Sequence, residues 1–279
     1  MKKLLSILLL LLLITPVFAD QDKETLIILD QSASMLDKYN ESSKIDYAKK
    51  AVKTVLNSIP QNERVGLRTV GVHPVVMSQM IFKNPNALCE ATALLNSIQA
   101  NNHQNIISSL LNIMPSGASP LQYTLQLAIR NDFNLNTPKK HIILITDGYE
   151  NCDGDPCMYI RREMMRRSDL KIDVVAIGVS NEEKNLLSCL SNATNGKFLD
   201  VNTSADIAPI SSKLSYNQPN YNYNNANMNN PNTYNNTGSF NNNANTKNYV
   251  QYNNPTVQTS TPRQQQRVLY NSYLLEFYE

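Results

Sequence analysis

The chain has 279 residues, of which 25 are Lys or Arg and 23 are Asp or Glu, so its formal net charge is +2 at pH 7. The sequence contains no run of Lys or Arg with interleaved aromatic residues, which is the pattern expected of a nucleic-acid-binding surface. Charge and composition therefore argue against a nucleic-acid partner.

Residues 1–19 have the form of a secretory signal peptide. Lys2 and Lys3 precede an apolar run over residues 4–14, and a small-residue cleavage site ends at Ala19. An uncleaved membrane anchor is the alternative, but the apolar run is shorter than the ~20 residues that a spanning helix needs. Cleavage would leave 25 − 2 = 23 basic residues against 23 acidic residues. We therefore expect an exported protein, periplasmic or extracellular, with no integral membrane span after cleavage.

The segment that follows the apolar run Thr25–Leu29 has the pattern Asp-x-Ser-x-Ser at Asp30, Ser32 and Ser34. A buried strand that ends in this way brings one carboxylate and two hydroxyls to its carboxyl end. Ligands that are all oxygens suit magnesium, calcium or manganese. The alternative is a strand that ends at an Asx or Ser turn and caps the next helix.

Two later segments favour the cation site. One is the loop Ser116–Leu121, which contains Ser119 and opens an amphipathic run from Leu121 to Ile129. The other is the apolar run His141–Thr146, which ends in Asp147. The chain thus has two buried strands that each end in an aspartate.

Apolar strands alternate with helix-like segments along the chain, and this alternation predicts a doubly wound α/β fold. We expect a mostly parallel sheet with helices on both faces and one antiparallel edge strand at Val75–Phe82. In open sheets of this kind, ligands bind at the carboxyl ends of the strands, where Asp30 and Asp147 are expected. The expected elements are 25–29, 45–56, 64–70, 75–82, 106–113, 121–129, 141–146, 156–165, 171–178, 182–190 and 197–201.

The motifs resemble the von Willebrand factor type A domain and its metal-ion-dependent adhesion site, over roughly residues 24–212. The resemblance implies one divalent cation, most often magnesium, with manganese or calcium as alternatives. It also implies that a protein partner completes the coordination with a carboxylate. Ser119 stands where the family usually has threonine; serine keeps the hydroxyl but lacks the β-branch that restricts the rotamer. The implied ligands are Asp30, Ser32, Ser34, Ser119 and Asp147.

The four cysteines are even in number, which in an exported chain predicts disulfides. Cys152 and Cys157 can close a short loop after Asp147, which would leave Cys89 and Cys189 to each other. The sequence does not choose among the three possible pairings. Zinc is a poor alternative, because a lone C-x4-C spacing lacks a second pair of ligands.

The composition changes after the expected domain, which covers residues 20–212. Residues 215–265 contain eighteen asparagines and no acidic residue, so we expect residues 213–265 to be a disordered linker. Tracts of this kind also self-associate through β-pairing, which keeps an assembly role open. Residues 266–279 are apolar and aromatic again, and we interpret them as a docking peptide or as a strand or helix added to the domain.

No catalytic motif is found: the sequence has no nucleophile elbow, phosphate-binding glycine loop or His-Glu-x-x-His. Metal-assisted hydrolysis would need a base, and Glu150, the nearest candidate, is better explained as a loop carboxylate. We expect an exported binding protein that engages an acidic group of a protein partner through its cation. The alternative is a structural component of the envelope, assembled through its tail, with the domain as a scaffold.

Overall fold

The computed structural model describes residues 23–84 and 87–214. The predicted signal peptide, the Asn-rich linker and the segment 266–279 lie outside the described residues, so the structure does not bear on them. Within the described ranges, no helix has the length and apolar character needed to cross a membrane.

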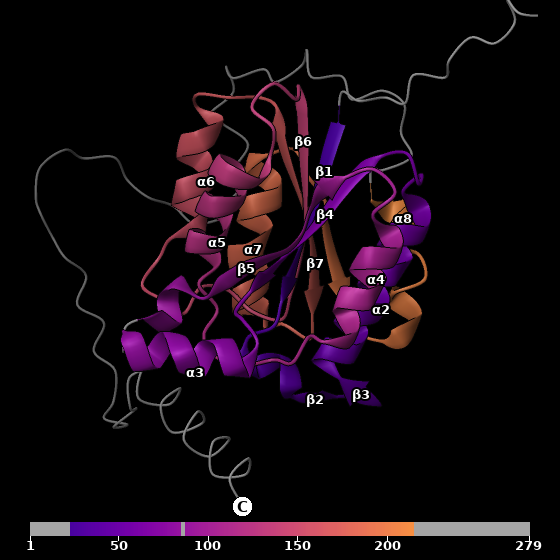
Figure 1. The fold of residues 1–279 in the computed structure, drawn as a ribbon. Helices are drawn as coiled ribbons and strands as arrows, with labels where there is room; N and C mark the ends of the chain where they lie inside the picture. The colour runs from indigo at the N-terminus through magenta and orange to yellow at the C-terminus, as the bar shows by residue number, and fades with distance from the viewer. Residues whose placement is uncertain (1–22, 85–86, 215–279) are drawn as a thin grey trace, which may run out of the picture. The chain divides into compact units, whose positions relative to one another are not determined.

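A six-stranded sheet forms the centre of the described fold (Figure 1). All neighbouring strands run parallel except β4 and β5, which run antiparallel. The predicted fold class, a mostly parallel sheet with one antiparallel edge strand, is confirmed. In spatial order the strands are β5 (Thr92–Gln99), β4 (Arg64–Val70), β1 (Lys23–Asp30), β6 (Lys139–Thr146), β7 (Leu170–Ile177) and β8 (Phe198–Val201).

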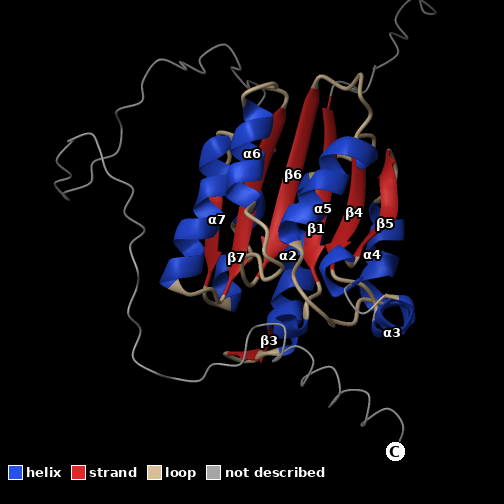
Figure 2. Cartoon of the chain, turned by 90° about the vertical axis from the view of Figure 1, so that its left-hand side faces the viewer, coloured by secondary structure: helices blue, strands red, loops and turns tan. Residues whose placement is uncertain are grey.

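Helices cover both faces of the sheet, and each face has its own apolar core (Figures 1 and 2). Strand β1 contributes to both cores, because side chains alternate along a strand: Ile27 and Leu29 face one helix layer, whereas Leu26 and Ile28 face the other. One layer holds α2 (Lys44–Ser58), α4 (His103–Leu111) and α8 (Ile210–Lys213), and the other holds α5 (Leu121–Leu127), α6 (Pro156–Met164) and α7 (Asn181–Ala193).

The sequence sets the start of α2 through a capping box. The Ser43 side chain accepts a hydrogen bond from the backbone N–H of Asp46, and the Asp46 carboxylate accepts one from the backbone N–H of Ser43. Lys44 is therefore the first residue of the helix.

Strands β1 and β6 lie side by side at the middle of the sheet. The chain leaves β1 toward β4 on one side and leaves β6 toward β7 on the other. The connections therefore diverge at the carboxyl ends of these two strands, which is where open α/β sheets form a ligand-binding crevice. Asp30 ends β1 and Asp147 follows β6.

The prediction of an edge strand at Val75–Phe82 is wrong, because this segment forms helix α3 (Pro74–Lys83). His73 caps the helix and Pro74 occupies its first turn, where its missing N–H costs nothing. A short apolar run does not by itself distinguish a strand from a helix. The antiparallel edge is instead β5, whose central residues are partly exposed.

Several short elements complete the described fold. Figure 1 shows α3 and the β2–β3 hairpin at the end of the molecule where β1 and β6 terminate. The short elements are η1 (Ala33–Leu36), β2 (Lys38–Tyr39), β3 (Ser42–Ser43), η2 (Ala87–Glu90), η3 (Ala128–Asp132) and η4 (Ser204–Asp206).

All four cysteines form disulfides, but the suggested pairing of Cys152 with Cys157 is wrong. Cys89 pairs with Cys152, with their Cα atoms 5.4 Å apart, and Cys157 pairs with Cys189, with their Cα atoms 5.8 Å apart. Cys157 lies in the first turn of α6, which packs against the helix α7 that carries Cys189. Tertiary packing, and not closeness in sequence, decides the pairing.

Candidate metal centre

Asp30 is a buried carboxylate at the end of β1. Its Oδ1 accepts a hydrogen bond from the backbone N–H of Ser32 at 2.8 Å. Its Oδ2 accepts hydrogen bonds from Thr146 Oγ1 at 2.6 Å and from Ser119 Oγ at 3.3 Å. Two predicted ligands from distant parts of the chain, Asp30 and Ser119, therefore lie in contact.

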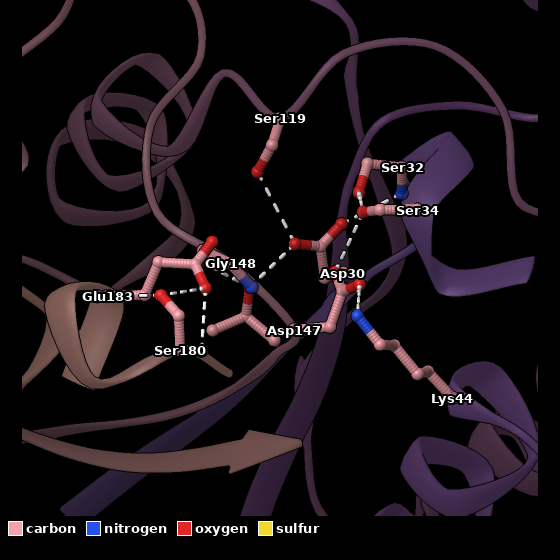
Figure 3. Close-up of polar contacts among 10 residues, drawn as sticks. Asp30, Ser32, Ser34, Lys44, Ser119, Asp147, Gly148, Ser180 and Glu183 are labelled. Atoms are coloured by element: carbon pink, nitrogen blue, oxygen red, sulfur yellow. Dashed lines mark hydrogen bonds and ion pairs between the residues drawn. The ribbon is translucent and has the colours of Figure 1, made fainter. Parts of the chain in front are cut away.

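Asp147 is the second buried carboxylate, directly after β6. Its Oδ1 accepts a hydrogen bond from Ser34 Oγ at 2.9 Å, and its Oδ2 accepts one from Lys44 Nζ, also at 2.9 Å. Ser34 Oγ lies 3.1 Å from Ser32 Oγ. Figure 3 shows these side chains pointing toward one another.

The structure thus brings all five predicted ligands together around one cleft of about 360 Å³. Ser34 is exposed, so the cleft is reached from solvent, whereas Asp30 and Ser119 lie at its buried side. The rest of the lining comes from the loop after Asp147, the start of α2 and the start of α7. Those lining residues are Lys44, Gly148, Tyr149, Glu150, Asn151, Glu182, Glu183 and Leu186.

Both carboxylates are less acidic than usual. Burial, and then the negative charge of Asp147, raise the pKa of Asp30 from 3.8 to about 6. Burial also raises the pKa of Asp147, although the nearby charge of Lys44 acts in the opposite direction. Two negative charges held close together away from water repel each other, and a cation between them would relieve this repulsion.

The donor set fits a hard divalent cation. Among the described residues there is no group of three or more His, Cys, Asp and Glu side chains that could hold a metal ion. The cleft combines two carboxylates with three hydroxyls, and oxygen donors of this kind suit magnesium, manganese or calcium. The ammonium of Lys44 at Asp147 indicates that this carboxylate attracts positive charge.

Asn151 fixes the loop that carries Ser119. Its Oδ1 accepts a hydrogen bond from the backbone N–H of Ser119 at 2.7 Å, and its own N–H donates to the Ser119 carbonyl at 3.4 Å. On the other side, the Gly117 carbonyl accepts a hydrogen bond from the N–H of Ala33 at 3.1 Å. The loop of Ser119 is therefore hydrogen-bonded both to the Asp-x-Ser-x-Ser segment and to the loop that follows Asp147.

Gly117 in this loop needs to be glycine. Its φ of +79° lies in the left-handed region, and a Cβ atom there would lie 2.2 Å from Met77 Cε. Met77 is the only buried side chain of α3. Helix α3 thus packs against the loop that presents Ser119.

Glu150 lines the cleft and accepts hydrogen bonds from two backbone N–H groups. Its Oε2 accepts a hydrogen bond from the backbone N–H of Gln122 at 2.7 Å, in the first turn of α5. Its Oε1 accepts one from the N–H of Cys152 at 2.8 Å. The carboxylate therefore stabilises the start of a helix and the loop after Asp147.

Sequence reasoning missed Thr146, Lys44 and Asn151. A signal for Thr146 existed in the sequence, because Thr146 ends the second apolar strand directly before Asp147. The observed register pairs Leu29 with Ile145 and so places Thr146 beside Asp30. Lys44 and Asn151 reach the cleft through tertiary packing, for which no spacing rule was available.

Comparisons with known proteins agree with the fold. Residues 25–150 match the family model of the von Willebrand factor type A domain. The uncharacterized protein YwmC of Bacillus subtilis (strain 168) is 26% identical over 214 residues, which cover 73% of this chain and 91% of YwmC. YwmD of the same organism is 25% identical over 211 residues, which cover 73% of this chain and 92% of YwmD.

Solved structures show the same fold at low sequence identity. A von Willebrand factor type A structure from Catenulispora acidiphila has a TM-score of 0.53 and 16% identity, covering 70% of this chain and 42% of that one. Proximal thread matrix protein 1 from the mussel byssus, with a zinc-occupied MIDAS (metal-ion-dependent adhesion site) motif, has a TM-score of 0.52 and 13% identity, covering 70% of this chain and 45% of that one. This chain therefore matches less than half the length of either structure.

Proposed function

Because this chain carries a von Willebrand factor type A domain over residues 25–150, we propose that it is an exported binding protein that holds a divalent cation and uses it to engage a carboxylate of a protein partner. Magnesium is the proposed cation, with manganese or calcium as alternatives. We propose no catalytic role.

The observation that supports this proposal most strongly is the convergence of the five predicted ligands at one crevice. They come from three separate parts of the chain, and hydrogen bonds connect them to one another. The two carboxylates would hold the cation together with the three hydroxyls. The bound cation would supply positive charge and an open coordination position for an anionic ligand.

The chemistry of the donors favours a protein carboxylate as that ligand. Two carboxylates and three neutral hydroxyls would supply about five of the roughly six oxygen ligands that magnesium prefers, so a coordination position is left for an oxygen anion that reaches the site from solvent. In proximal thread matrix protein 1 the MIDAS motif holds zinc. That finding supports divalent cation binding by this type of motif and leaves the choice of metal to experiment.

Export is supported by the two disulfides, since disulfides persist mainly in oxidising compartments. The proposed signal peptide agrees with this location. Periplasmic and extracellular destinations both fit these observations.

The direct test is calorimetric titration of the mature chain with magnesium, manganese and calcium. We expect binding by the unmodified chain and its loss in an Asp30→Asn, Asp147→Asn double variant. Glu182→Gln is the matched control, because it removes a carboxylate from the same cleft without touching a proposed ligand. Equal binding by the unmodified chain and the double variant would refute the site.

A further inference from the structure

Lys44 is the only Lys, Arg or His among the described residues that line the cleft. Five carboxylates line the same cleft: Asp30, Asp147, Glu150, Glu182 and Glu183. The cleft therefore has an excess of negative charge even with a divalent cation added. An anionic ligand that approaches it is repelled by the carboxylates and attracted by two sources of positive charge, the cation and Lys44.

The position of Lys44 is fixed by its backbone and by its side chain. Its N–H donates to the Asp37 carbonyl at 3.0 Å, and the capping box at Ser43 and Asp46 sets the helix start around it. Its side chain is only 14% exposed, and its Nζ lies 2.9 Å from Asp147 Oδ2. Figure 3 shows the side chain reaching from α2 to Asp147.

Resting on the proposed function above, we propose that Lys44 is a specificity-determining residue with two effects on binding. In the cation-free protein its ammonium pairs with Asp147 and so competes with the cation for that carboxylate. In the cation-loaded protein the same ammonium would be a second positive group in the cleft, and it would bind the carboxylate of the partner.

The two effects follow from one position. An ammonium and a divalent cation that share Asp147 repel each other, so removing the ammonium favours the cation. A ligand carboxylate has two oxygens, and one can approach the cation while the other accepts a hydrogen bond from an ammonium nearby. The rim carboxylate of Glu182 is exposed and opposes the approach of an anion, an effect that Lys44 offsets.

The test compares Lys44→Met with Lys44→Arg and with Lys53→Met. Methionine keeps the unbranched stem of lysine and removes the charge, and arginine keeps the charge. Lys53 is an exposed lysine of the same helix, so Lys53→Met controls for the loss of one positive charge from α2. Thermal unfolding verifies that each variant is folded.

The first readout is magnesium affinity, measured by calorimetry with the metal alone. We expect Lys44→Met to bind magnesium about tenfold more tightly than the unmodified chain, because the ammonium that competes with the cation for Asp147 and repels it has been removed. We expect Lys44→Arg and Lys53→Met to stay close to the unmodified chain.

The second readout is binding of the peptide N-acetyl-Gly-Glu-Gly-amide to magnesium-saturated protein, followed by NMR shifts, with the glutamine peptide as the neutral control. We expect Lys44→Met to bind the glutamate peptide about tenfold more weakly, and Lys44→Arg to retain binding.

Opposite signs for the metal and the peptide are the signature of the proposed role, since a general loss of structure would weaken both. If the unmodified chain binds both but Lys44→Met changes neither, or weakens magnesium binding, the role of Lys44 is refuted and the proposed function stands. If the unmodified chain binds neither magnesium nor the peptide, both proposals fail.

Discussion

Burial places Asp30 where its negative charge is unfavourable unless a cation lies close by. Its pKa is raised from 3.8 in the unfolded chain to about 6 in the metal-free fold. A carboxyl with a raised pKa in the folded state adds stability at low pH, and this contribution is lost as the pH rises through about 6. At neutral pH the ionised carboxylate therefore lowers the stability of the metal-free protein.

Asp30→Asn should consequently stabilise the metal-free protein at neutral pH. We expect the free energy of unfolding to rise by about 1–3 kcal/mol, because the substitution removes a buried charge while the side chain keeps its shape. The same variant should gain no stability from added magnesium. Denaturant unfolding with and without magnesium measures both effects, and a variant less stable than the metal-free parent would contradict this account.

Cation affinity should also depend on pH through Asp30. Protons and the cation compete for the carboxylate, so affinity should be constant above pH 7 and fall as the pH drops below about 6. The charged groups that face Asp30 are Asp147 and, through it, Lys44. Magnesium titrations at about pH 7.5, 6 and 5 measure the effect, with roughly tenfold weaker binding per unit at the acidic end for a single competing proton. An affinity that does not change over this range would exclude Asp30 as a ligand.

Among the elements, the loop between Asp147 and α6 has the most unusual attachment. A disulfide ties it at Cys152 to η2, and a second one ties its end at Cys157 to α7. Asn151, which holds the backbone of Ser119, directly precedes the first of these cysteines. The Cys89–Cys152 disulfide is therefore placed to position a ligand loop, whereas the other disulfide joins two helices.

Removing the two disulfides separately should separate these roles. We expect the Cys89→Ser, Cys152→Ser double variant to lose both stability and magnesium affinity, and the Cys157→Ser, Cys189→Ser double variant to lose mainly stability. The loss of stability should be about 2–4 kcal/mol in each case. Denaturant unfolding and calorimetry measure the two quantities. Magnesium affinity that falls equally in both variants would show that the Cys89–Cys152 bond has no particular role at the site.

The elements that sequence predicted correctly are those in which the apolar pattern and the flanking residues indicate the same structure. Strand β1 is a continuous apolar run that is buried on both faces, and α2 combines helical periodicity with a cap. The prediction for the segment of α3 was wrong, because it used the apolar run alone and left out the helix-start signal of His73 and Pro74. Strand β5 was missed because its partly exposed residues do not form a continuous apolar run.

At the scale of the whole molecule, the site was predictable where it depends on topology. Parallel strands that end in aspartate bring their carboxylates to one edge, so Asp30 and Asp147 could be placed together from the sequence. The disulfide pairing and the contact of Lys44 with Asp147 depend on how helices pack against the sheet and against each other. No local pattern in the chain specifies those distances.

The core of the described residues reaches to residue 214. Ile210 and Leu214 are both buried in the core beside α2, so the domain extends past Ser212, the boundary expected from composition. A chain that ends at Leu214 retains these contacts, whereas one that ends at Ser212 removes Leu214.

Truncation after Leu214 therefore separates the two functions that the sequence left open. We expect the shortened chain to unfold within about 2 °C of the full chain, since less than about 1 kcal/mol of stability should be lost. It should also keep its magnesium affinity and its binding of the glutamate peptide. A shortened chain that binds magnesium but no longer forms the complexes of the full chain would support assembly through residues 215–279. Full retention of both activities would assign binding to the domain, because every group proposed to contact the ligand lies before Leu214.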